Sequence, residues 1–112
     1  MIQNRKYLYT DVNGMEVRDD VAPLFDLVAN DGDVHEYIAD IVPSHWHSEL
    51  EIFWLLEGRV RVGIGEEVHE IEAGYGCFIN TGVIHSVAAL VNRPCRYRSF
   101  VFDAGILAGV PG

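Results

Sequence analysis

The sequence predicts an all-β domain, either a barrel or a jelly roll of two facing sheets. Short runs of alternating apolar and polar residues are separated by Gly, Asn, Asp or Pro about every eight to twelve residues. No convincing helix precedes residue 103, and the sequence contains no internal repeat. Short strands with this turn spacing and no helices between them are typical of closed or double-sheet β folds.

The first forty residues contain two turn signals and weaker strand signals. Asp11-Val12-Asn13-Gly14 and Asn30-Asp31-Gly32-Asp33 are rich in turn-forming residues. Residues 21–28 are apolar around Pro23 and fit a short strand or a loop equally well. Residues 35–42 alternate well enough to predict a strand that leads into a histidine-rich segment.

From residue 50 onward the strand pattern becomes regular. Residues 50–56 form a dense apolar run typical of a strand buried on both faces. Residues 59–64 alternate, with valine inward and arginine outward. We expect residues 45–64 and 68–91 to form the two central halves of the barrel. Further strands are expected at residues 68–72, 77–79, 83–91 and 96–102.

Glycine residues mark a turn before residue 77, and Asp103 marks the end of the last predicted strand. The turn before residue 77 should need a positive φ at Gly74 or Gly76. Asp103 is a good helix cap, and the apolar residues after it resemble the start of a helix. We therefore expect the chain to be the first part of a longer protein.

Composition and charge fit one folded domain over residues 1–112. The sequence is 49% hydrophobic and 11% aromatic, unlike a disordered chain. No apolar run reaches the about 18 residues that cross a membrane, and the start lacks a signal peptide. Cys77 and Cys95 have no metal-finger spacing and are expected to be reduced thiols of a cytoplasmic protein. Eight basic against seventeen acidic residues give a net charge of −9, which argues against binding to nucleic acid or an anionic membrane.

Two imidazoles two residues apart are the most specific chemical feature of the sequence. In an extended strand, His45 and His47 point to the same face and can approach one ion. Glu51 shares their parity if the strand is unbroken, and His85 would have to arrive from another strand. Three nitrogens and a carboxylate suit a divalent first-row ion, with Zn, Fe(II), Mn, Ni and Cu(II) all admissible. The alternative is a polar pair at a barrel mouth that binds no metal.

The spacing of these residues resembles the two signatures of the cupin superfamily of small β-barrels. Residues 45–58 match the first signature, and residues 74–85 resemble the second. Asn80 stands where the second signature usually has proline, and Ala89 where it usually has asparagine. The resemblance implies a cupin-type double-stranded β-helix, a jelly-roll barrel, with a divalent metal ion. The metal ligands that it implies are His45, His47, Glu51 and His85.

The sequence resembles one branch of that superfamily more closely than the others. Residues 45–52, Leu56-Glu57-Gly58, Phe78-Ile79-Asn80 and residues 98–107 are similar to the N-terminal sensor domains of AraC-type (arabinose-regulator) transcription factors. The resemblance implies a small-molecule effector in the barrel and pairing with a second copy. It also implies that a helix-turn-helix domain beyond this chain contacts DNA, so that this domain does not. Such sensor domains sometimes keep the ligand side chains with no metal bound.

Two main functions remain open from the sequence. The favoured one is effector sensing in an AraC-type regulator, without turnover. The alternative is a free-standing metal-dependent cupin enzyme, a dioxygenase or isomerase, in which the ion acts as a Lewis acid or activates oxygen. A storage or structural cupin is a third, minor reading. A small effector needs an apolar pocket wall, and the ligand-contacting residues that we predict are Phe53, Leu55, Val62, Phe78 and Tyr97.

Overall fold

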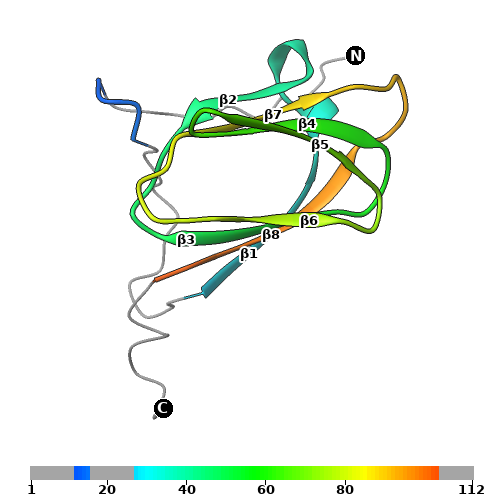
Figure 1. The fold of residues 1–112 in the computed structure, drawn as a ribbon. Helices are drawn as coiled ribbons and strands as arrows, with labels where there is room; N and C mark the ends of the chain where they lie inside the picture. Colours follow the sequence, from blue (N-terminus) through cyan, green and yellow to red (C-terminus); the bar gives the residue numbers. More distant parts are fainter. Residues whose placement is uncertain (1–11, 16–26, 104–112) are drawn as a thin grey trace, which may run out of the picture.

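In the described part of the chain, eight strands form two four-stranded sheets that face each other across the core (Figure 1). The computed structural model describes residues 12–15 and 27–103. The strand orders are β1-β8-β3-β6 and β2-β7-β4-β5, and every pairing within them is antiparallel. The predicted all-β, double-stranded β-helix fold is therefore confirmed. The strands are β1 (Leu27–Asp33), β2 (Ile41–His45), β3 (Leu50–Leu55), β4 (Arg59–Ile64), β5 (Glu67–Glu72), β6 (Gly76–Ile79), β7 (His85–Ala89) and β8 (Arg96–Phe102).

Alternation along the strands places one set of side chains between the two sheets. In β4, Val60 and Val62 are fully buried while Arg59 and Arg61 are exposed, as their alternation predicted. The same rule applies to β3, β7 and β8, whose inward side chains meet those of β4. The buried core consists of Val34, Val42, Phe53, Leu55, Val60, Val62, Ile71, Val87, Cys95 and Tyr97.

Strand β3 is buried on one face only, although its apolar sequence predicted burial on both. Ile52 and Trp54 point outward and are 39% and 48% exposed. Phe78 pairs with Ile52 across β3 and β6 and is 54% exposed on the same outer face. The prediction that Phe78 lines an inner pocket is therefore wrong. Cys77 and Ile79 have the inward parity in β6, because a shift of one residue moves a side chain to the other face of a sheet.

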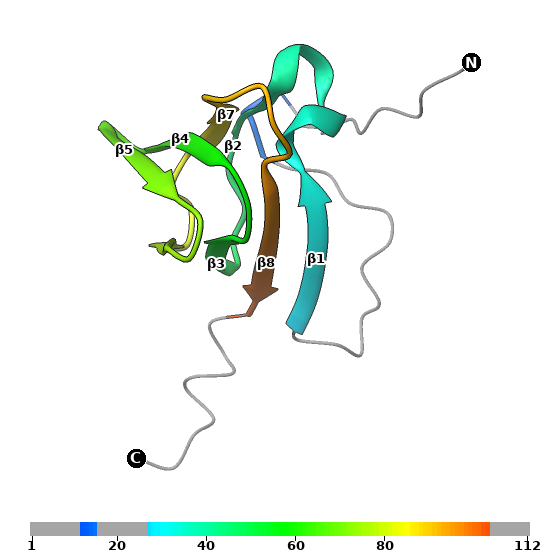
Figure 2. The same cartoon turned by 90° about the vertical axis from the view of Figure 1, so that its right-hand side faces the viewer.

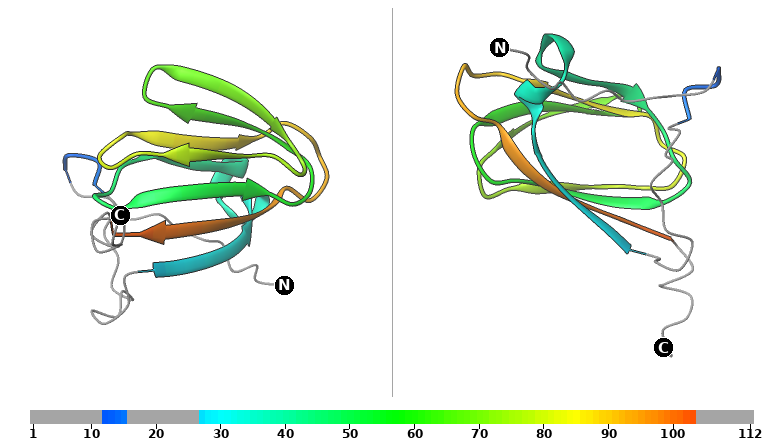
Figure 3. Two further views of the ribbon diagram at one scale, coloured as in Figure 1. Left: turned by 60° about the horizontal axis from the view of Figure 1, so that its bottom comes forward. Right: turned by 180° about the vertical axis from the view of Figure 1, so that it is seen from behind.

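Strand β1 occupies the segment for which turn-forming residues predicted a turn at residues 30–33. All seven residues of β1 pair with β8 (Figure 3). Figure 2 also shows β1 and β8 running side by side. The Asp31 carboxylate accepts a hydrogen bond from Arg98 Nε at 2.7 Å, so this turn-forming side chain has a cross-strand partner. Residues 21–26, expected as a strand or a loop, lie outside the described residues.

The strand predicted over residues 35–42 begins only at Ile41. Two short 3₁₀ turns precede it, η1 (Val34–Glu36) and η2 (Ile38–Asp40). Asp33 accepts a hydrogen bond from the His35 amide at 2.9 Å, and the Glu36 carboxylate accepts one from the Asp33 amide at 2.7 Å. This reciprocal pair is a capping box, which the sequence signals as an acidic residue followed by glutamate three positions later.

The predicted glycine turn is confirmed at Gly74, whose φ is 95°. Its neighbour Gly76 lacks a positive φ but has another constraint, because a Cβ there would overlap the Phe53 carbonyl oxygen. The helix expected after Asp103 lies outside the described residues. Within the described part of the chain, no helix has the length and apolar character needed to span a membrane.

Candidate metal centre

Both sheets and one connecting loop contribute to the predicted metal centre. His45 ends β2 and lies directly opposite His85, the first residue of β7. His47 lies in the loop between β2 and β3, and Glu51 comes from β3 in the other sheet. The β2–β7 pairing contains an irregularity between Val42 and His45, so the regular alternation of β2 does not by itself set the direction of His45.

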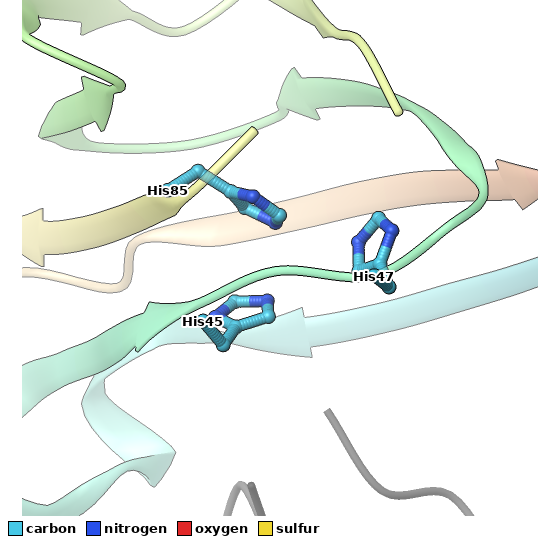
Figure 4. A group of neighbouring side chains, drawn as sticks. All are labelled: His45, His47 and His85. Atoms are coloured by element: carbon cyan, nitrogen blue, oxygen red, sulfur yellow. The ribbon is translucent and has the colours of Figure 1, made fainter. Parts of the chain in front are cut away.

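The four predicted ligand side chains meet inside the barrel. One ring nitrogen from each of the three histidines lies within 4.8 Å of the other two (Figure 4). Glu51 Oε1 lies 2.9 Å from His47 Nε2 and 3.4 Å from His85 Nε2. Each of the four residues is less than a tenth exposed. The structure therefore brings the three predicted histidines together, with the predicted Glu51 beside His47 and His85.

Backbone carbonyls fix which nitrogen of each imidazole faces the centre. Nδ1 of His45 lies 2.7 Å from the Pro43 carbonyl oxygen, and Nδ1 of His85 lies 2.8 Å from that of Val83. Nδ1 of His47 lies 3.0 Å from the carbonyl oxygen of Glu49. A carbonyl oxygen can only accept, so each Nδ1 carries a proton and donates it. The three Nε2 atoms are then the ones left to bind a metal ion, and the carbonyl contacts orient the rings.

Burial and mutual contact set the charges at the centre. Burial, helped by the nearby His85, lowers the pKa of His45 to about 4, so His45 is neutral at pH 7. Burial by itself would raise the pKa of the Glu51 carboxyl. The close contacts with His47 at 2.9 Å and with His85 at 3.4 Å outweigh burial and lower the pKa of this carboxyl to about 2. Neutral imidazole and ionised carboxylate are the protonation states that a metal ion requires.

The residues present fit a divalent cation. His85 Nε2 is buried and has no hydrogen-bond partner among the described residues, since its 3.4 Å approach to Glu51 lacks hydrogen-bond geometry. His47 Nε2 and Glu51 Oε1 are both acceptors once His47 Nδ1 holds its proton, so they need a shared proton or a cation between them. Three nitrogens and a carboxylate oxygen form a ligand set that Zn, Fe(II), Mn and Ni accept.

The loop of the second signature is fixed to the loop of the first. The Gly82 amide donates to the His47 carbonyl oxygen at 2.9 Å. Asn80, which replaces the usual proline, accepts a hydrogen bond from the Thr81 amide through its side chain at 2.8 Å. The side chain therefore stabilises the turn in a different way from a proline ring. Ala89 pairs with Val60 in the adjacent strand and contributes only a small apolar side chain.

Four of the five predicted effector-contacting residues point into the barrel. Phe53, Leu55, Val62 and Tyr97 are at most 7% exposed, whereas Phe78 is outside as described above. Phe53 and Tyr97 stack with ring centroids 5.3 Å apart. Sequence reasoning missed Tyr37, whose hydroxyl lies 3.3 Å from that of Tyr97, because the segment around it was read as a strand.

The chain belongs to the cupin family, since residues 29–103 match the family described as Cupin domain. Solved structures agree with this fold. A protein with a double-stranded β-helix domain from Klebsiella pneumoniae is 20% identical, with a TM-score of 0.63, over 82% of this chain and 80% of that one. A predicted oxalate decarboxylase from Thermotoga maritima is 27% identical, with a TM-score of 0.53, over 55% of each chain.

A curated relative is a regulator. The uncharacterized HTH-type transcriptional regulator YdeC of Bacillus subtilis is 33% identical over 64 residues, which are 57% of this chain and 22% of that protein. The chain thus spans about a fifth of the length of the curated relative that it matches. The fold is shared with proteins of different functions, so the function must be argued from the site.

Proposed function

We propose that this chain is the effector-sensing domain of an AraC-type transcriptional regulator. The observation that carries the proposal is the 33% identity to a helix-turn-helix regulator over 64 residues, combined with a buried polar site at one end of an apolar interior. A small molecule that binds there would shift the balance between arrangements of a DNA-binding domain outside this chain. Pairing with a second copy belongs to the same proposal, and sedimentation of the purified protein tests it.

Each part of the barrel has a role in this proposal. His45, His47, Glu51 and His85 would hold a divalent ion, which when bound supplies a Lewis-acidic contact for an oxygen of the effector. Phe53 and Tyr97 form a stacked aromatic wall against which the rest of a small effector can pack. The tyrosine hydroxyl can exchange its contact with Tyr37 for one with the effector.

The interior favours binding over turnover. Besides the four ligands, the titratable side chains on the inner wall include Cys77 and Tyr97. Burial raises the pKa of Cys77 to about 11 and raises that of Tyr97 as well, so both stay neutral near pH 7. General acid–base catalysis works best with a pKa near the working pH. These two groups are therefore better suited to shaping a pocket than to transferring protons.

The test uses the complete natural gene product in a transcriptional reporter. Glu51→Gln is expected to change the reporter response while the protein stays folded, because it removes the charge of the site at equal size. Glu57→Gln changes an exposed carboxylate that is paired with Arg96 outside the metal centre, and it should leave the response as it is. An unchanged response in Glu51→Gln would contradict the proposal.

The second candidate is a metal-dependent enzyme. It is favoured by the ligand set and by the 27% identity to a predicted oxalate decarboxylase. The decisive assay measures formate release from oxalate by the purified chain loaded with Mn(II). Turnover that depends on the metal and is lost in His85→Ala would replace the sensor assignment by an enzymatic one.

A further inference from the structure

A cleft lies between the free edges of the two sheets. Strand β5 is the last strand of one sheet, and β6, which follows it in the chain, is the last strand of the other. Figure 1 shows the two strands on opposite sides of the barrel, joined by the turn at residues 73–75. The cleft has a volume of about 620 Å³, within the range of small-molecule sites.

The inner wall of this cleft is apolar and leads toward the metal centre. Ile71 faces inward from β5 opposite Val60, and Cys77 faces inward from β6 opposite Phe53. Both side chains line the cleft, and Ile71 is only 6% exposed. The next inward residue of β6 is Ile79, which pairs with Glu51 of the metal centre. Strand β6 therefore lines the cleft at Cys77 and lies beside Glu51 of the metal centre at Ile79.

The outer part of the cleft is negatively charged. Glu67, Glu70 and Glu72 line it together with one guanidinium, that of Arg59. Glu70 lies 3.1 Å from Arg59 and 3.4 Å from Arg61, so two guanidinium groups already engage this carboxylate. Glu67 lies 3.2 Å from Nε2 of His69. The excess of carboxylates favours a cation at the mouth and disfavours a carboxylate or phosphate ligand.

Two exposed aromatic rings complete the lining. Tyr75 in the connecting turn is 68% exposed, and Phe78 in β6 is 54% exposed. Both line the cleft opposite the acidic strand β5. An aromatic face attracts an organic cation through the ring quadrupole. Phe78 therefore does not line the interior of the barrel but lines this cleft.

We propose that the cleft between β5 and β6 binds a small organic cation, an alkylammonium compound whose charged group lies between the Glu67–Glu72 strand and the rings of Tyr75 and Phe78. The proposal goes beyond the proposed function, because Phe53, Tyr97 and the four residues of the metal centre do not line this cleft. The apolar part of the ligand packs on Ile71 and Cys77, and its charged group stays at the mouth. The apolar wall and the acidic mouth of the cleft then each contact one end of the same molecule.

The experiment compares three probes of nearly the same shape. Choline carries a quaternary ammonium. In 3,3-dimethylbutan-1-ol carbon replaces that nitrogen, and 3,3-dimethylbutanoate carries a negative charge. Binding is followed by amide NMR of the purified chain, with chelator and with added Zn²⁺. Choline is expected to move the amide signals of β5 and β6 in a saturable way. The neutral isostere should bind about twofold to fivefold more weakly than choline, which is the size of an exposed cation–π contact. The anion should not bind.

Variants test the contacts separately. Tyr75→Leu should weaken choline binding by about twofold to fivefold, whereas Tyr75→Phe keeps the ring and should retain it. The double variant Glu67→Gln, Glu72→Gln should bind choline more weakly than Tyr75→Leu does. Glu57→Gln, at an exposed carboxylate paired with Arg96, is the matched control and should have no effect.

Three outcomes would overturn the proposal: equal or tighter binding of the anion, signal changes confined to other strands, or changes that follow protein concentration rather than ligand. The last would indicate that a second copy covers the edge of β5. The reporter experiment is independent of these measurements. Choline binding without any reporter response would leave the cleft assignment in place and remove the regulatory one.

Discussion

Three single residues show how local backbone contacts prepare the metal centre. The Nδ1 atoms of His45, His47 and His85 all contact carbonyl oxygens two residues away in sequence. These contacts select the tautomer whose Nε2 faces the centre. The resemblance of the sequence to the cupin signatures predicted His45, His47, Glu51 and His85 as the ligands, and the structure places the three histidines together with Glu51 beside two of them. The tautomers could not be predicted, because they depend on the backbone path around each histidine and on an irregularity in β2.

Metal binding should stabilise the protein through these residues. A divalent ion at 100 times its dissociation constant is expected to add about 2.7 kcal/mol to the free energy of unfolding. His47→Ala removes one ligand and should abolish most of this gain, because the remaining set is incomplete. Thermal melts with Zn²⁺ and with a chelator measure the effect.

His69→Ala is the control for the metal prediction. His69 is exposed and lies in β5 outside the four-residue centre, so its loss should leave the Zn²⁺-dependent gain intact. Equal stabilisation of the His47→Ala variant and the original protein would show that the ion binds elsewhere. Elemental analysis of protein purified without chelator then identifies the metal.

Replacing either of two glycines near the β5–β6 turn should destabilise the fold, for a different reason in each case. Gly74 has a φ of 95° and open space around it, so Gly74→Val costs about 1–3 kcal/mol through backbone strain. Gly76→Val brings a side chain against the Phe53 backbone and costs about 1–3 kcal/mol or more through overpacking. Asparagine separates the two causes, because it tolerates positive φ but not a clash. Denaturant unfolding should show Gly74→Asn close to the original protein and Gly76→Asn clearly destabilised.

At the scale of elements, sequence patterns predicted β4 well and β1 poorly. Alternation of valine and arginine in β4 depends only on which face is buried, and that is a local property. Strand β1 contains Asn30, Asp31 and Gly32, and it is a strand because β8, almost seventy residues later, supplies its hydrogen-bond partners. Long-range pairing of this kind overrides local turn preference. The spacing of Asp33 and Glu36 in the capping box of η1 is present in the sequence, but the alternation of residues 35–42 points to a strand instead.

The element η1 is held by a histidine that should make stability depend on pH. His35 Nδ1 lies 3.0 Å from the Asp40 carboxylate, and Nε2 lies 3.1 Å and 2.8 Å from the carbonyl oxygens of Val91 and Arg93. All of these partners accept, so both nitrogens are satisfied only in the imidazolium. The hydrogen bond with Asp40, more than the opposing burial, raises the pKa of His35 above 6.5.

The raised pKa of His35 in the folded state fixes the direction in which stability changes with pH. The stabilising contribution of His35 is fully present below the unfolded pKa of about 6.5 and is lost as the pH rises through the folded value. The contribution should be about 0.2–1 kcal/mol, because the pair is partly exposed to solvent. His35→Gln, which carries no charge, should show a smaller change in unfolding free energy between pH 5.5 and pH 8.5. A larger change in the variant would contradict the assignment.

At the scale of the whole molecule, the charge distribution complements the apolar barrel. The chain has a net charge of −9, and β5 alone contributes three carboxylates at Glu67, Glu70 and Glu72. Arg59 in the neighbouring strand β4 pairs with Glu70, and on the other sheet Arg98 in β8 pairs with Asp31 in β1. Such pairs engage part of the basic side chains, and the net negative charge of the chain repels phosphate groups.

The whole-molecule prediction is that this chain does not bind DNA by itself. Proteins that bind duplex DNA gain affinity by releasing counterions from phosphates, and that gain needs several lysines or arginines on one face. The eight basic residues of this chain are outnumbered by seventeen acidic ones. A gel-shift titration at physiological salt, with the promoter of the natural gene as the probe, should therefore show no retarded band. The complete gene product should retard the same probe if a second domain carries the basic surface. A band formed by the isolated chain that disappears with rising salt would mean that the barrel itself contacts phosphates, and it would contradict the division of roles that the sensor proposal requires.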